Sequence, residues 1–290
     1  MNNYIWLVRR EFWENRAIWV IPLVIGGFMV LCALFGRVDL MAVSSHALGR
    51  TVGQAFLGTV GATFFVVMSI YAAWYLLDCL YADRKDRSVL FWKSLPISDA
   101  TTVLSKLATA VIVIPLVYFV AADLTTLLVA FIISVRAGSL VAGTLWQAGL
   151  WLQIQVLWLY MILTTAVWYL PVTAYLLLIS SWAKRAVTLW SILPPLALIL
   201  GERWFFGTHV IAHQLSLRLF GFTEAAFSAN LASWASATAA DSDSIRTPAD
   251  ILSFLDFAGF FSSMATWAGV AVGVALIIGS IQLRMRRTEI

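Results

Sequence analysis

The sequence predicts an all-α integral membrane protein with six transmembrane helices. Hydrophobic residues make up 61% of the 290-residue chain and charged residues only 12%, whereas about a quarter of a soluble domain is charged. The mean hydropathy is +0.89. Because a bilayer core about 30 Å thick needs roughly 20 apolar residues per helix, each long apolar window is a candidate span. These windows are residues 17–35, 56–79, 106–134, 146–182, 186–200 and 264–281.

The first 16 residues predict an amphipathic helix that lies along the membrane interface. Ile5, Val8 and Phe12 recur close to helical spacing, and Arg9 and Arg10 lie between them. Such a pattern favours a helix with one apolar face in the headgroup region. This helix either anchors the topology or acts as a lever that docks against a soluble partner.

The fourth window is too long for one perpendicular helix, and the basic residues indicate how often it crosses. A kink at Pro171, or an interfacial first turn around Trp146, would absorb the excess length of a single crossing. A single crossing places most of the 19 Lys and Arg residues on the same side of the membrane as both termini. Lys and Arg are enriched in cytoplasmic loops, so this side is predicted to be the cytoplasm. These flanking residues and their contact with anionic lipids also explain the isoelectric point of about 9.2, without nucleic-acid binding.

A charged and aromatic stretch, residues 81–96, separates the second and third windows. Asp83 and Arg87 form an i, i+4 pair with the acid first, which is the more stabilising order on a helix. Pro96 ends this helix, and Ser98 can cap the next one. The stretch is therefore predicted to be a short helix that projects from two membrane spans on the cytoplasmic side.

This stretch resembles the cytoplasmic loop of type-2 ATP-binding-cassette permeases, the ABC-2 exporter family. The resemblance rests on LYADRKDRSVLFWKSLPISDATTVLSKL, with its aromatic, acid and arginine pattern, its SLPIS break and Lys106 at the start of the next span. It extends to the N-terminal helix and to six spans with both ends inside. It implies that the stretch holds a coupling helix that docks into a separate ATPase subunit. The candidate contact residues are Asp83, Arg84, Lys85, Asp86, Arg87, Phe91 and Trp92.

The same resemblance implies partners. It implies a dimer of identical or different permease chains, each with one ATPase subunit, and it places ATP and Mg on that ATPase. None of the 17 glycines is followed by lysine, so the chain lacks the Gly-Lys-Ser/Thr end of a phosphate-binding loop and is not expected to be an enzyme. Gly269 and Gly273, at GxxxG spacing, permit close helix packing within the chain or at the dimer seam.

Polar residues inside the predicted spans are candidates for a translocation path. Asp123 lies in the outer half of the third span, where an acid facing lipid would cost at least about 3 kcal/mol, so it is expected to face protein or water. It either lines the path or pairs with a residue such as Arg203 or Arg136. The remaining candidates for the path, with plain helix packing as the alternative, are Gln153, Gln155 and Trp158.

Residues 202–263 are predicted to form an extended outer segment, longer than the compact outer element that the resemblance implies. Within it, TPADILSFLDFAGFF predicts an amphipathic helix capped by Thr247 and started by Pro248, which gates the exit or anchors at the membrane surface. His209 and His213 share a helix face, but two ligands without a third do not make a metal site.

The function expected from these features is the permease subunit of an ATP-driven exporter in a bacterial inner membrane. Its cargo is expected to be hydrophobic or amphipathic, such as a peptide antibiotic, a drug or a lipid, because the spans carry few charges that could solvate an ionic molecule. Two other classes stay open. One is a membrane scaffold that transports nothing, and the other is a secondary transporter driven by protons through Asp123.

Overall fold

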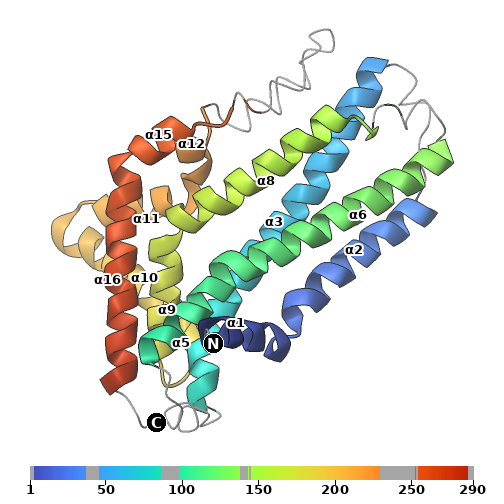
Figure 1. Cartoon of the computed structure of the whole chain (residues 1–290). Helices are drawn as coiled ribbons and strands as arrows, with labels where there is room; N and C mark the ends of the chain where they lie inside the picture. Colours follow the sequence, from blue (N-terminus) through green and yellow to red (C-terminus); the bar gives the residue numbers. More distant parts are fainter. Residues whose placement is uncertain are drawn as a thin grey trace.

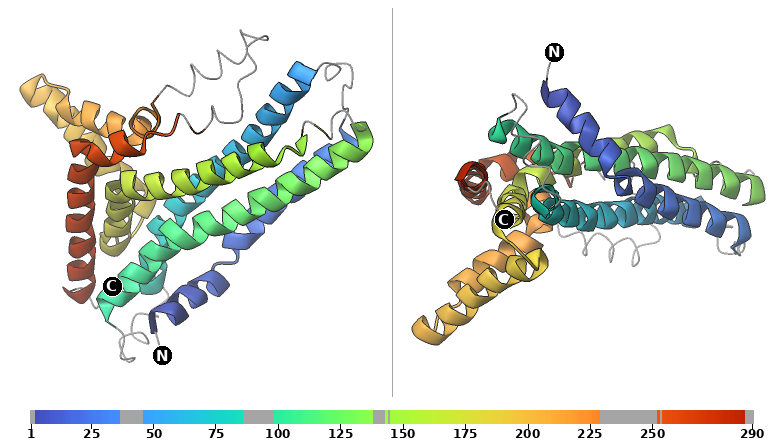
Figure 2. Two further views of the ribbon diagram at one scale, coloured as in Figure 1. Left: turned by 45° about the horizontal axis from the view of Figure 1, so that its top comes forward. Right: turned by 90° about the horizontal axis from the view of Figure 1, so that it is seen from below.

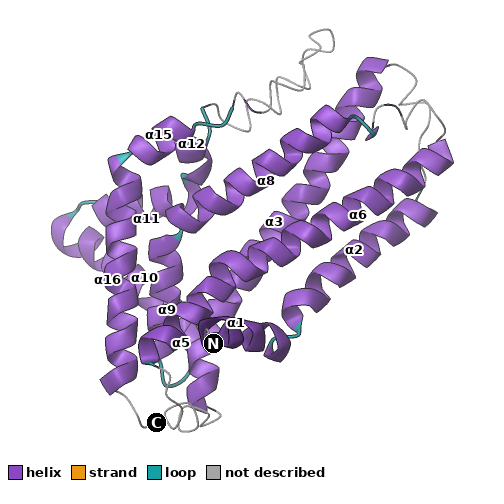
Figure 3. Ribbon diagram, viewed as in Figure 1, coloured by secondary structure: helices purple, strands orange, loops and turns teal. Residues whose placement is uncertain are grey.

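The described part of the protein is built from α-helices, seen here in a computed structural model (Figure 3). The structure describes residues 3–36, 46–85, 98–137, 143, 145–228, 252 and 254–286. Within these ranges the only β-type pairing is an isolated antiparallel bridge between Phe227 and Leu255. The predicted all-α class is confirmed.

The helices follow one another along the chain from the N-terminus to the C-terminus (Figure 1). A π-helical turn, η2, joins α5 to α6 without a break. The elements are α1 (Asn3–Glu14), α2 (Ala17–Phe35), α3 (His46–Lys85), α5 (Asp99–Ala108), η2 (Thr109–Val113), α6 (Ile114–Ala137), α8 (Ala148–Trp168), α9 (Leu170–Trp182), α10 (Val187–Phe206), α11 (Val210–Phe220), α12 (Phe222–Ala226), α15 (Phe257–Ser262) and α16 (Met264–Arg286).

Five of the described helices are long and apolar enough to cross a membrane, so the chain is a multi-pass membrane protein. Their outward faces carry large apolar side chains, which suits contact with lipid. The first of them, α2, begins and ends where the sequence predicts. The five candidate spans are Ala17–Phe35, Gly58–Lys85, Asp99–Arg136, Trp151–Trp168 and Met264–Arg286.

The fourth predicted span, residues 146–182, is divided between two helices. α8 and α9 meet at Tyr169, whose backbone (φ −87°, ψ 7°) leaves the helical region. Pro171 lies in the first turn of α9. A proline has no N–H to donate and is tolerated in a first turn, so the chain bends next to the residue where the kink was predicted.

The fifth predicted span, residues 186–200, lies in α10, which is not among the five long apolar helices. α10 contains Pro194 and Pro195 and ends with Glu202 and Arg203 in its last turns. These residues lower the mean hydropathy of a helix that is otherwise rich in leucine and isoleucine. The number of spans that length and composition support within the described residues is therefore five, not six.

The helices form two groups that meet at one end of the molecule. α2, α3, α6 and α8 lie side by side as inclined rods, while α9 packs against α16 in a steeper pair (Figures 1 and 2). α10 and α11 project from the bundle as an arm (Figure 2). α1, α5 and the last turns of α3 and α16 lie at the same end of the molecule (Figure 1).

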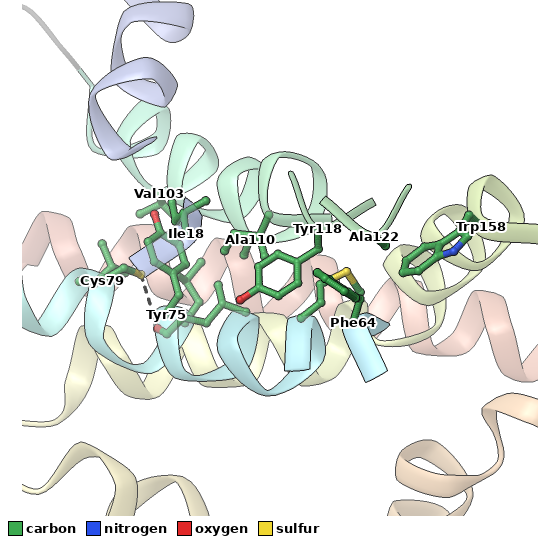
Figure 4. Close-up of a cluster of buried hydrophobic side chains, with 14 of the residues drawn as sticks. Ile18, Phe64, Tyr75, Cys79, Val103, Ala110, Tyr118, Ala122 and Trp158 are labelled. Atoms are coloured by element: carbon green, nitrogen blue, oxygen red, sulfur yellow. Dashed lines mark hydrogen bonds between the residues drawn. The ribbon is translucent and has the colours of Figure 1, made fainter. Parts of the chain in front are cut away.

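The main core runs between α3 and the continuous rod of α5, η2 and α6. Its fully buried side chains include Phe64, Leu76 and Tyr118. Figure 4 shows the row of core residues from Cys79 at one end to Trp158 at the other. A second apolar cluster, around Tyr160, Trp168, Phe222 and Phe260, joins α8 to α12 and α15.

The GxxxG glycines of the last helix face other helices of the same chain. A Cβ on Gly273 would lie 3.1 Å from backbone atoms of Leu170 and Pro171, so this glycine permits the close approach of α16 to α9. A Cβ on Gly269 would run into the guanidinium group of Arg218. The motif therefore serves packing within the chain, which is one of the two roles that its spacing allowed.

Candidate functional site

Five charged side chains meet at the end of the bundle where the two helix groups converge. We call Glu11, Asp83, Asp99, Lys106 and Arg284 the base cluster. The Lys106 ammonium lies 2.8 Å from Glu11 Oε1 and 3.3 Å from Asp83 Oδ1. The Arg284 guanidinium lies 3.4 Å from Asp83 Oδ2 and 3.0 Å from Asp99 Oδ1. The cluster thus ties together α1, α3, α5 and α16.

The base cluster is largely withdrawn from solvent. The side chains of Glu11 and Lys106 are each 4% exposed and that of Arg284 is 8% exposed. Burying charges is tolerated only when their remaining hydrogen-bonding groups are satisfied. Glu11 meets this condition, since its Oε2 accepts a hydrogen bond from the Tyr75 hydroxyl at 2.8 Å and another from Asn15 Nδ2 at 3.3 Å.

The base cluster lies at both roots of the segment that the sequence predicts to contact an ATPase. Asp83 is two residues from the end of α3, and Asp99 is the first residue of α5. The predicted cap is confirmed, because Ser98 Oγ accepts a hydrogen bond from the Thr101 N–H at 3.1 Å. Residues 86–97, which join the two roots, lie outside the described residues.

Three of the residues that are predicted to contact an ATPase are described, and each has different surroundings. Asp83 is 8% exposed and turned into the base cluster. Arg84 reaches across to α9, where its guanidinium donates to the backbone carbonyls of Ser180 and, at 2.8 Å, Ala183. Lys85 is exposed at the end of α3. The other predicted contact residues, which lie outside the described residues, are Asp86, Arg87, Phe91 and Trp92.

A second polar contact lies inside the membrane-spanning part of the bundle. Gln155 Nε2 on α8 donates a hydrogen bond of 2.8 Å to Asp123 Oδ1 on α6. The predicted pairing of Asp123 with an arginine is wrong for this structure, since Arg136 instead donates to the carbonyl of Ala33 and Arg203 is exposed on α10. The partner is an amide one helix away, which the spacing of residues along the chain could not reveal.

The other two candidates for the translocation path, Gln153 and Trp158, are buried in the helix bundle. Gln153 is 7% exposed, and its Oε1 has no hydrogen-bond partner within the described part of the chain. Trp158 is 6% exposed and makes edge and tilted contacts with Phe65 and Phe119. Trp158 therefore belongs to the core, and Asp123 and Gln155 are the candidates that the structure brings together.

The outer segment contributes a capped helical hairpin. Glu202 near the end of α10 accepts hydrogen bonds from the Thr208 hydroxyl at 2.8 Å and from the N–H groups of Val210 at 2.6 Å and Ile211 at 2.8 Å. A carboxylate at these free N–H groups stabilises the start of α11 and closes the turn. Neither His209 nor His213 joins a group of metal-ligating side chains within the described ranges. The predicted helix in TPADILSFLDFAGFF is only partly present. Residues 247–251 and 253 lie outside the described residues, Leu255 forms the bridge with Phe227, and the helix that the structure shows is α15, which starts at Phe257 after Asp256 caps it.

The sequence did not indicate the roles of two members of the base cluster, Glu11 and Arg284, or of Tyr75, which donates a hydrogen bond to Glu11. Glu11 stands among other charged residues, which favours a place on the solvated face of the helix. Its spacing of four from the buried Leu7 puts it on the buried face instead. Tyr75 and Arg284 gave no signal, since their partners are distant in the chain.

Comparison of the chain with protein-family models, with curated proteins and with solved structures finds no match.

Proposed function

We propose that this chain is the membrane-spanning permease subunit of an ATP-driven exporter of the ABC-2 type. Its partners in this proposal are a separate ATPase subunit, which binds ATP and Mg, and a second permease chain. The membrane is the inner membrane of a bacterium, with both chain ends in the cytoplasm. The cargo is a hydrophobic or amphipathic molecule.

The observation that carries this proposal is the position of the base cluster. It fastens both roots of residues 86–97 to α1 and α16 through the two cations Lys106 and Arg284. A force applied to the intervening segment would therefore reach four helices at once instead of bending α3 and α5 separately. A permease that is driven from outside the membrane needs such a rigid connection between its contact segment and its spans.

Six crossings with both ends on one side are part of the proposal. Length and composition support five spans within the described residues; the proposal takes α8 and α9 together as one crossing and adds α10 as the sixth. α1 and the last turns of α16 both lie at the end of the bundle that bears the base cluster (Figure 1). Lys85, Lys184 and Arg286, which lie near the ends of α3, α9 and α16, fit the positive-inside rule.

Association with an ATPase is the direct test. The full-length chain is co-expressed with an ATP-binding-cassette protein encoded beside it, and the complex is purified through a tag on the ATPase. We expect the two to co-purify, and we expect Arg87→Ala with Trp92→Ala to abolish this. Lys184→Ala, which removes an exposed charge between α9 and α10, is the matched control and should co-purify normally. Co-purification that survives the double substitution would refute the coupling assignment.

A further inference from the structure

A cleft of about 690 Å³ opens between the α1–α2 elbow and one face of α3. Its volume lies within the range of small-molecule sites. Asn15 and Ile21 line it from the elbow, and α3 contributes side chains over several turns. The cleft lies beside the base cluster, whose Glu11 and Lys106 form part of its wall.

The α3 wall changes from apolar to acidic along its length. Val67, Tyr71, Trp74 and Asp78 follow one another at intervals of three or four residues, so they lie on one face of the helix. Val67 and Asp78 are about 17 Å apart along the axis. Val67 is nearer the middle of the candidate span, and Asp78 is nearer its charged end. The cleft therefore offers an apolar region and an acidic region to one elongated molecule.

One carboxylate at the acidic end of the cleft, that of Asp78, has no hydrogen-bond or ion-pair partner among the described residues. Glu11 and Asp83 are paired with Lys106, and Glu14 lies 2.6 Å from Arg10. Asp78 is exposed and takes part in no hydrogen bond or ion pair with any residue that the structure describes. Its neighbour one turn away, Trp74, is 64% exposed and lines the same cleft.

We infer that this cleft binds a small amphiphilic molecule with a single positive charge. The cation lies between the Asp78 carboxylate and the ring of Trp74, since an aromatic face attracts a cation and a carboxylate neutralises it. The apolar body lies along Tyr71, Val67 and Ile21. Four carboxylates, those of Glu11, Glu14, Asp78 and Asp83, and two cations, Arg10 and Lys106, line this end, and both cations are already paired with acids. The net negative charge disfavours an anion of the same shape.

This inference concerns binding by the chain alone. Only the further step, that the bound molecule is the exported cargo, rests on the proposed function. On that reading the cargo enters from the membrane leaflet on the side of the chain ends. The ATPase test and the binding test use different residues, so either can fail while the other succeeds.

The binding test uses dodecyltrimethylammonium below its critical micelle concentration, an elongated amphiphile with one quaternary ammonium group. The full chain is placed in nanodiscs of phosphatidylcholine, and radiolabelled probe is measured by equilibrium dialysis with empty discs subtracted. We expect saturable binding that the unlabelled cation displaces. Radiolabelled dodecyl sulfate, which has the same apolar chain and the opposite charge, is measured in separate samples and should show no saturable binding. Saturable binding of both ions, or uptake no greater than that of empty discs, would overturn the inference.

Matched variants locate the site. Asp78→Asn should weaken the affinity about tenfold, and Trp74→Ala by several fold. Asp78→Glu keeps the charge and should bind nearly as well as the native chain. Glu224→Gln removes an exposed acid far along the chain, at α12, and should leave the affinity unchanged. Equal loss in Asp78→Asn and Glu224→Gln, or no loss in Asp78→Asn, would show that the cation does not bind in this cleft.

Discussion

The base cluster and the Asp123–Gln155 pair both place carboxylates among packed helices, but they satisfy them differently. In the base cluster, three carboxylates share two cations, and the side chains of Glu11 and Lys106 are almost fully buried. In the span, one half-buried carboxylate accepts one hydrogen bond from a neutral amide. The first arrangement fixes the relative positions of four helices, whereas the second links only α6 to α8.

This difference indicates which polar site maintains the architecture. A buried ion pair that loses one member leaves an uncompensated charge in the interior, which is costly. A single hydrogen bond at a half-buried position can be exchanged for another acceptor, or for water, at a small cost. We therefore expect substitutions in the base cluster to affect folding and substitutions at Asp123 to leave it nearly unchanged.

Lys106→Met should have the largest effect. It leaves Glu11 without its cation and removes one partner of Asp83, which typically costs about 3–5 kcal/mol of folding free energy. The free energy of unfolding would be measured in lipid nanodiscs. Lys85→Met removes an exposed ammonium from the end of α3 and should change little. Adding Glu11→Gln to Lys106→Met should recover part of the loss, and a failure to do so would mean that the two residues are not coupled.

Arg284→Met should have an intermediate effect, about 1–3 kcal/mol. Asp83 keeps its contact with Lys106, and the side chain of Asp99 is 22% exposed, so water can replace part of what is lost. Amide hydrogen exchange should become faster in the first turn of α5 and the last turns of α16. Arg286→Met, two residues further along the same helix and exposed, is the control; equal exchange in both variants would contradict the link between these helices.

Asp123→Asn should have the smallest effect on stability, less than about 1 kcal/mol, because asparagine keeps an oxygen that can accept from Gln155. In vesicles with the ATPase present, transport of a hydrophobic cation should continue at a similar rate. Abolished transport in this variant, together with transport that persists without the ATPase, would favour the proton-driven alternative. No stimulation of the ATPase by the native chain would favour the scaffold.

The helical class and the bounds of α2 were predictable because they depend on local patterns of apolar residues. The Ser98 cap and the bend beside Pro171 were predictable for the same reason, since a hydroxyl or a proline acts within one helical turn. α10 was predicted to be a span from its leucines and isoleucines, but Pro194, Pro195 and the charged residues Glu202 and Arg203 lower its mean hydropathy.

The candidate site was only partly predictable, because its contacts join residues far apart in the chain. The expected pair of Asp83 with Arg87 stays a prediction, because Arg87 lies outside the described residues; the ion pairs of Asp83 with Lys106 and Arg284 could not be read from the spacing. Lys106 was interpreted as a marker of the start of the third span, although it is 3% exposed and central to the base cluster. A charge written beside an apolar segment does not reveal whether it faces solvent or another helix.

The π-helical turn that joins α5 to α6 sets the direction in which Asp123 on α6 points relative to Lys106 on α5. In this turn the N–H of Ile114 bonds to the carbonyl of Thr109, five residues earlier. One extra residue in a helix rotates everything beyond it by about 100° relative to an uninterrupted α-helix. Deleting one residue from the turn would therefore rotate Asp123 relative to Lys106 without altering either side chain. Asp123 could then no longer face Gln155 while Lys106 faces Glu11. The extra residue of the π-helical turn is what lets one continuous rod present both side chains to their partners.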